Sequence, residues 1–216
     1  MNNTIPFIVE KALNSSYIDS LFVALFFEPS HIQDILSEYP ENISFMYLQE
    51  LIHENFIWNM RRKYFIDSST INEIRNYMVL CGWKNGSDVA NTYEVQDLYT
   101  FIINGFHKSK LNFSIKNNGK DDVLKMNYIE LKVTKNDNIK NMLDEYFDRN
   151  IPEYYFVETP NFIPIYLNRG FETENAKLNN FFVDIKQGIS ISKNNSNIYQ
   201  KNLVWIIHSI VCYYHF

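Results

Sequence analysis

The sequence predicts an α+β fold with a helical N-terminal half and an antiparallel sheet in the C-terminal half. Apolar residues recur at helical spacing through about residues 1–108, and a strand hairpin and one more helix follow over 109–150. Residues 151–216 are rich in the β-branched and aromatic runs typical of strands. Because helices and strands occupy separate stretches, a regular βαβ alternation is excluded. The length of 216 residues suits a single domain, or one domain with an insertion.

The strongest helical pattern begins at Ser15 and Ser16 and continues to Phe27, where Pro29 stops it. A hydroxyl residue before an apolar run is an N-cap signal. The segment is apolar nearly all round, and such helices are buried. We therefore expect it to be the central helix of the domain.

Weaker helical patterns follow in the first half, over Ile32–Glu38, Ser44–Phe56, Ser69–Cys81 and Glu94–Phe106. Glu73 completes a capping-box pattern at the start of the third, and Gly82 breaks the chain after it. These signals predict a bundle of helices before the first strand.

Two alternating strands, Lys110–Lys116 and Val123–Val133, flank the turn sequence of residues 117–120, and this arrangement predicts a hairpin. Asp137–Arg149 follows as a helix. The strands expected after it are Phe162–Leu167, Phe181–Ile185 and Leu203–Cys212.

Composition excludes several classes of protein. A hydrophobic content of 46% supports a sizeable core, and a net charge of -5 argues against a nucleic-acid binder. Two cysteines, Cys81 and Cys212, argue against a disulfide scaffold or a Cys-rich zinc site. The apolar runs are shorter than the roughly 18 residues of a membrane span, and the N-terminus lacks a basic leader. We expect an intracellular protein without membrane, metal or cofactor.

The start of the first helix carries a motif. The run from Asn14 to Leu21 resembles the cysteine box of ubiquitin-specific proteases, roughly Gly-Asn-Thr-Cys-Tyr-x-Asn-Ser-Leu, and it matches at Asn14, Tyr17, Ser20 and Leu21. Ser16 occupies the place of the nucleophilic cysteine. Taken alone, a serine at a helix start is far more often a cap than a nucleophile.

Further segments resemble the same family, in the family's order. The segment Val95–Phe101 is similar to its Gln-Gln-Asp-x-x-Glu-Phe box, with matches at Gln96, Asp97 and Phe101. The later segments that resemble family strands and the start of its histidine box are Thr159–Arg169, Lys177–Phe181 and Tyr199–Phe216. The resemblance therefore extends over nearly the whole chain.

This resemblance implies a papain-like cysteine protease fold and a deubiquitinase. Such an enzyme cleaves the bond after the C-terminal glycine of ubiquitin or a ubiquitin-like protein, and it acts in the cytoplasm or nucleus of a eukaryotic cell, including a virus-infected one. Ser16 then stands at the nucleophile position and His215 is the general base. The residues that support the oxyanion or the site are then Asn14, Gln96 and Asp97. The alternative for Asp97 is an exposed carboxylate on a helix.

The sequence departs from the family pattern in ways that bear on activity. A serine at position 16 keeps the shape of the site but holds its proton far more tightly than a thiol, so this chain is expected to be inactive or nearly so. Lys11 stands where family members carry an oxyanion-binding asparagine. The paired zinc-binding cysteines that many family members carry are absent from the sequence.

The C-terminal end leaves a choice open. His215 is the counterpart of the family histidine within this chain, and the alternative places that histidine beyond Phe216. The third triad residue has no candidate downstream, so we expect a C-terminally incomplete domain. Two further functions stay open, a non-catalytic ubiquitin-binding pseudoprotease or scaffold module and a protease acting on another polypeptide.

Overall fold

Helices and strands both contribute to the structure, a computed structural model, which supports the α+β prediction. The chain divides into two compact units, unit 1 (Met1–Leu111 with Ser209–Phe216) and unit 2 (Asn112–His208). The residues that the structure describes are 7–29, 36, 39–83, 95–106, 113–117, 123–149, 154–156, 162–168, 171–172, 177–178, 183–185, 188–190, 204–206, 208 and 211. The predicted helix Ile32–Glu38 lies almost wholly outside them.

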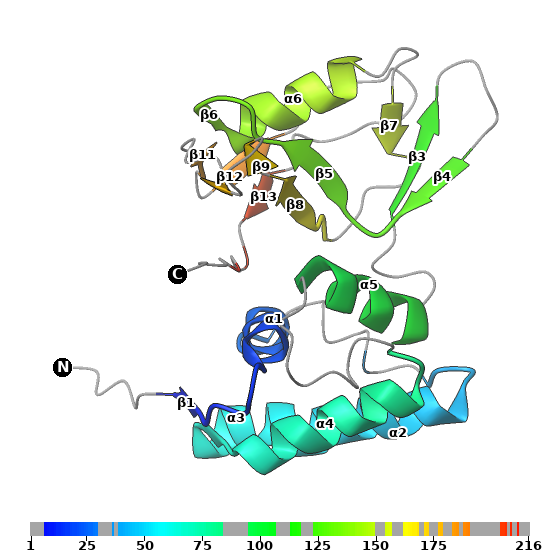
Figure 1. Cartoon of the computed structure of the whole chain (residues 1–216). Coiled ribbons are helices and arrows are strands. Elements are labelled where there is room, and N and C mark those ends of the chain that lie inside the picture. Colours follow the sequence, from blue (N-terminus) through cyan, green and yellow to red (C-terminus); the bar gives the residue numbers. More distant parts are fainter. Residues whose placement is uncertain are drawn as a thin grey trace. The chain divides into compact units, whose positions relative to one another are not determined.

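The described residues of unit 1 form mainly helices (Figure 1), and two short strands among them pair in parallel. Helix α5 lies beside α1, and α2 and α4 run side by side. The elements in chain order are β1 (Ile8–Val9), α1 (Ser16–Phe26), α2 (Ile43–Leu51), the π-helical segment η2 (Ile52–Ile57), α3 (Trp58–Lys63), β2 (Phe65–Ile66), α4 (Ser68–Leu80) and α5 (Val95–Phe106).

The central position of α1 is confirmed within unit 1. Its buried side chains form one broad face of the helix, and the ring of Phe22 meets that of Phe56 from η2 edge-on, with 5.3 Å between the ring centroids. Two arginines hold its ends. Arg61 of α3 donates from Nε to the Phe26 carbonyl oxygen at 3.0 Å, and Arg75 of α4 donates from Nη2 to the Leu13 carbonyl oxygen at 2.8 Å. The helix is therefore fixed at the end that carries the motif.

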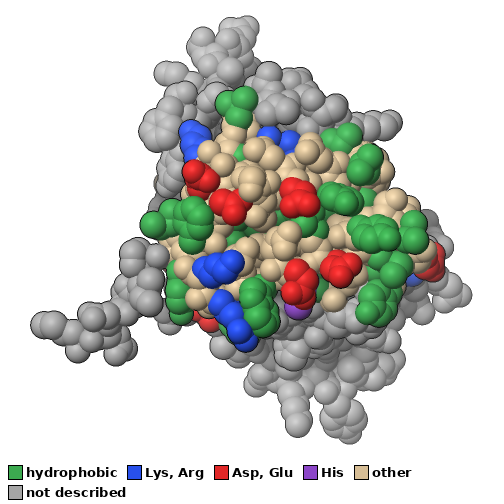
Figure 2. Space-filling view, turned by 90° about the horizontal axis from the view of Figure 1, so that it is seen from below, with side chains coloured by type: hydrophobic (Ala, Val, Ile, Leu, Met, Phe, Trp, Pro, Cys, Tyr) green, Lys and Arg blue, Asp and Glu red, His purple; other side chains and the backbone are tan. Residues whose placement is uncertain are grey.

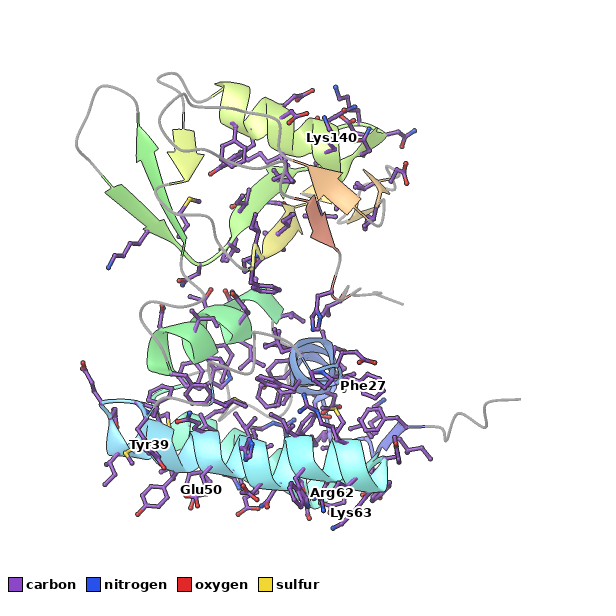
Figure 3. The ribbon with its side chains drawn as sticks, turned by 180° about the vertical axis from the view of Figure 1, so that it is seen from behind. Phe27, Tyr39, Glu50, Arg62, Lys63 and Lys140 are labelled. Atoms are coloured by element: carbon purple, nitrogen blue, oxygen red, sulfur yellow. The ribbon has the colours of Figure 1, made fainter. Side chains whose placement is uncertain are left out.

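The helix predicted over Ser44–Phe56 extends to Lys63, through the π-helical segment η2. Its outer face mixes apolar and charged side chains (Figure 2), and Figure 3 shows Glu50, Arg62 and Lys63 projecting from it. The guanidinium of Arg62 lies 3.6 Å from the centre of the Trp58 ring. This cation–π contact helps to keep an aromatic side chain at the surface.

The capping box predicted for α4 is wrong. Asp67 is the N-cap, and its carboxylate accepts a hydrogen bond from the Thr70 amide at 2.7 Å, while Glu73 is exposed on the helix surface. With the N-cap at Asp67 the third helical residue is Thr70, so Glu73 lies too far along α4 to bond back to the N-cap amide. After Leu80 the chain turns at Gly82, whose φ of +96° suits glycine.

The described residues of unit 2 form one helix and several small sheets. The predicted hairpin is present as β3 (Phe113–Asn117) and β4 (Val123–Met126). The remaining described elements are β5 (Ile129–Lys132), β6 (Asp137–Asn138), α6 (Ile139–Arg149), β7 (Tyr154–Phe156), β8 (Ile165–Asn168), β9 (Phe171–Glu172), β10 (Lys177–Leu178), β11 (Val183–Asp184), β12 (Gly188–Ser190) and β13 (Val204–Ile206).

The prediction of an antiparallel sheet in the C-terminal half is wrong, as is the single strand Val123–Val133. The chain bends after β4, and β5 pairs in parallel with β8, with Ile129 opposite Ile165 and Leu131 opposite Leu167. The strands β6 and β11 also pair in parallel. A helix such as α6 between two strands returns the chain in the same direction, which favours parallel pairing. Antiparallel pairs occur in the separate small sheets β4–β3–β7, β9–β10 and β12–β13.

The core of unit 2 lies between β5 and α6. Ile129 and Leu131 are buried together with Leu143 and Phe147 of the helix. No helix in the described ranges is long and apolar enough to cross a membrane.

Candidate active site

The side chain at position 16 is exposed at the start of a buried helix. Ser16 is the first residue of α1, and Ser15 before it is 0% exposed. Asn14 precedes both in the left-handed conformation, with a φ of +50°, a region that asparagine tolerates better than most residues. This turn at Asn14 leads from the loop after β1 into α1. Two of the predicted site residues, Asn14 and Ser16, are therefore neighbours at the helix start.

Ser15 is the N-cap residue by position, but its side chain does not cap the helix, which corrects the expected capping role. Its Oγ lies 2.7 Å from Asp19 Oδ2 and 3.2 Å from the Ala12 carbonyl oxygen. The N-caps of α2 and α4, Asn42 and Asp67, both accept from an amide of the first turn. The N-terminal end of α1 differs from both, because the side chain of its N-cap residue Ser15 accepts from none of its first amides.

Asp19 is the most perturbed ionisable group near position 16. Burial raises its pKa from 3.8 to about 6, and this effect outweighs the hydrogen bond from Ser15 and the charge of Arg75, which both lower it. Its Oδ1 is buried and accepts no hydrogen bond within the described part of the chain. A carboxyl group in this environment changes its charge close to neutral pH.

Arg75 is 4% exposed and links α4 to the loop before α1. It donates to Leu13 through Nη2 and to Asn72 Oδ1 through Nη1 at 3.3 Å. The backbone just before position 16 is thereby tied to α4. The arginine acts on Asp19 through its charge.

Gln96 and Asp97 lie in the first turn of α5, the helix that packs on α1. Asp97 is exposed, and Gln96 is half-buried with its Oε1 enclosed. The Oε1 atom of Gln96 accepts no hydrogen bond from any residue that the structure describes. Their supporting role stays a prediction, and His215 lies outside the described residues.

Sequence reasoning missed Ser15, Asp19 and Arg75 as a connected group. The sequence does contain one indication for each of the two charged residues. Asp19 is an acid in an otherwise apolar helix, and Arg75 lies on the apolar stripe of α4 between the buried Ile74 and Met78. A charge at such a position needs a partner, although the periodicity does not say which.

The described ranges hold no group of three or more His, Cys, Asp or Glu side chains placed to bind an ion. Burial raises the pKa of the Cys81 thiol, which makes it a poor nucleophile. A comparison with protein-family models finds no match, and a comparison with curated proteins finds none either.

Proposed function

We propose that the chain has the architecture of a deubiquitinase-type thiol hydrolase in which position 16 holds the nucleophile. The substrate is the bond after the C-terminal glycine of ubiquitin or a ubiquitin-like protein, in the cytoplasm or nucleus of a eukaryotic cell. The observation that carries the proposal is the exposed side chain of Ser16 at the start of the buried helix α1. The resemblance of the segment Asn14–Leu21 to a cysteine box supports it.

The helix start suits an anion in two ways. The aligned peptide dipoles of α1 favour negative charge at its N-terminus, which lowers the pKa of a thiol there. The backbone amide of position 16 can donate to the oxyanion that forms when the thiolate attacks the carbonyl carbon. His215 would take the thiol proton and return it to the leaving amine, and water would then hydrolyse the thioester. With a serine at position 16 the first step is disfavoured, so the chain has little or no activity.

The test compares this chain with Ser16→Cys in hydrolysis of a fluorogenic amide of the ubiquitin C-terminus. We expect turnover only with the thiol variant, and none when His215→Ala is added to it. Ser20→Cys is the matched control, because it places a thiol one turn further along the same helix. Absence of both turnover and ubiquitin binding in Ser16→Cys would contradict the proposal.

A second candidate function is a non-catalytic ubiquitin-binding module. It is favoured by Ser16 together with Lys11, which replaces the family's oxyanion-binding asparagine. In this case Ser16→Cys binds ubiquitin as tightly as the parent chain but hydrolyses nothing. Calorimetric titration with ubiquitin, run on both proteins, separates the two functions.

A further inference from the structure

The hydroxyl of Ser15 lies between two acceptors but carries a single hydrogen. Its Oγ is 2.7 Å from Asp19 Oδ2 and 3.2 Å from the Ala12 carbonyl oxygen. When Asp19 is ionised, its carboxylate takes this hydrogen, because a charged acceptor forms the stronger bond. When Asp19 is protonated, its own O–H can donate to Ser15 Oγ, and Ser15 can then donate to Ala12. Protonation of Asp19 therefore reverses the direction of the hydrogen bond between Ser15 and Asp19. It also adds a hydrogen bond from Ser15 to the Ala12 carbonyl oxygen in the loop.

The surroundings of Asp19 leave its charge poorly compensated. Ser15 is fully buried, and Asp19 Oδ1 accepts no hydrogen bond from the residues that the structure describes. Arg75, from α4, donates hydrogen bonds to Leu13 and Asn72. Burial accordingly raises the pKa of Asp19 to about 6, so both charge states are accessible in the neutral range.

Arg75 is the charged group that acts on Asp19 across an element boundary. Helix α5 packs on α1, and η2 reaches it through Phe56. These two elements carry four other titratable side chains, which are Asp97, Tyr99, His53 and Glu54. The last two pair with each other at the surface at 2.9 Å, and Asp97 is exposed. None of the four contributes to the shift of Asp19.

We propose that Ser15 and Asp19 form a one-proton switch that anchors the loop before α1, which makes Asp19 a positioning residue for the side chain at position 16. In the protonated state the loop is held through the Ala12 carbonyl. In the ionised state that bond is lost, and a negative charge stands within one helical turn of position 16. The catalytic meaning of position 16 rests on the proposed function, whereas the switch itself does not.

The first test is amide hydrogen exchange of the chain as it is, at pH 5 and pH 7.5, corrected for intrinsic exchange rates. The Ile18 amide donates to the Ser15 carbonyl oxygen at 2.8 Å and so reports release of the loop. We expect its protection to fall about threefold to tenfold at the higher pH, as for the loss of one hydrogen bond. Unchanged protection between the two pH values would overturn the switch.

Two variants and a control locate the effect. Asp19→Asn removes the titratable group but keeps an amide that can donate to Ser15, so Ile18 protection should be the same at both pH values. Ser15→Ala removes the shared hydroxyl and should abolish the pH dependence as well. Glu50→Gln neutralises an exposed carboxylate on the outer face of α2 (Figure 3) and should behave as the parent. If Ile18 protection falls between pH 5 and pH 7.5 in both Asp19→Asn and Ser15→Ala as it does in the parent, the assignment of the switch to Ser15 and Asp19 is refuted.

The second test measures the charge at position 16. In a Ser16→Cys background, the alkylation rate of that thiol is followed by mass spectrometry of its peptide, so Cys81 and Cys212 do not contribute. Residues three apart on a helix are neighbours, and a nearby carboxylate raises a thiol pKa. Adding Asp19→Asn should raise the rate about threefold to tenfold at pH 7.5, and an unchanged rate would refute the positioning role. Neither test uses ubiquitin, so this inference and the proposed function fail separately.

Discussion

Replacing Asp19 by asparagine should stabilise the protein at neutral pH and have no such effect in acid. Burial raises the folded-state pKa of Asp19 from 3.8 to about 6. The carboxylate is therefore less favourable in the folded than in the unfolded chain. The stability that the neutral carboxyl provides is fully present below about pH 3.8 and is lost as the pH rises through about 6. Asp19→Asn keeps a neutral group at every pH.

The size of the effect follows from the two pKa values. A difference of about two pKa units corresponds to about 3 kcal/mol at most, at about 1.36 kcal/mol per unit. Asp19 is only partly buried, and solvent screens part of this energy. We therefore expect the free energy of unfolding of Asp19→Asn, relative to the parent, to rise by about 1–2 kcal/mol between pH 4 and pH 7.5.

Urea denaturation of both proteins at pH 4, 5, 6 and 7.5 measures this difference. Other carboxyl groups cancel, because they are common to the two chains. Any constant cost of the amide shifts all four values equally and does not affect the slope. A difference in unfolding free energy that stays flat within about 0.3 kcal/mol from pH 4 to 7.5 would refute the reasoning.

Three other substitutions test the stability of unit 1, each by thermal and urea unfolding. A Cβ added at Gly105 would overlap the buried ring of Phe45, so Gly105→Ala should cost about 1–2 kcal/mol although alanine favours the helix; a stabilised variant would contradict this. The Tyr99 hydroxyl is buried with no hydrogen-bond partner among the described residues, so Tyr99→Phe should be neutral or stabilise by up to about 1 kcal/mol; a loss beyond that would show a partner. Asp67→Ala removes the cap on the Thr70 amide and should cost about 1 kcal/mol at pH 7. Because hydrogen bonds from Ser69 and Thr70 lower the pKa of Asp67, that cost should disappear in strong acid and persist at pH 5.

Local patterns predicted most of the described helices. Ser15 and Ser16 before an apolar run, with Pro29 after it, indicated a helix that the structure places at Ser16–Phe26. Helical spacing likewise predicted α4 and α5 to within a few residues. The exposed position of Ser16 also follows from its place at the start of a buried helix.

The sequence by itself therefore determined where helices form and which residue begins α1, since these depend on neighbours within a few positions. Only the tertiary structure decided that Ser15 turns to Asp19 instead of capping, and that Arg75 reaches Leu13, 62 positions away. It also decided that β5 pairs in parallel with β8. Such contacts depend on which groups are buried together after the chain has folded. The spacing of apolar residues along the sequence does not show this burial, which also raises the pKa of Asp19.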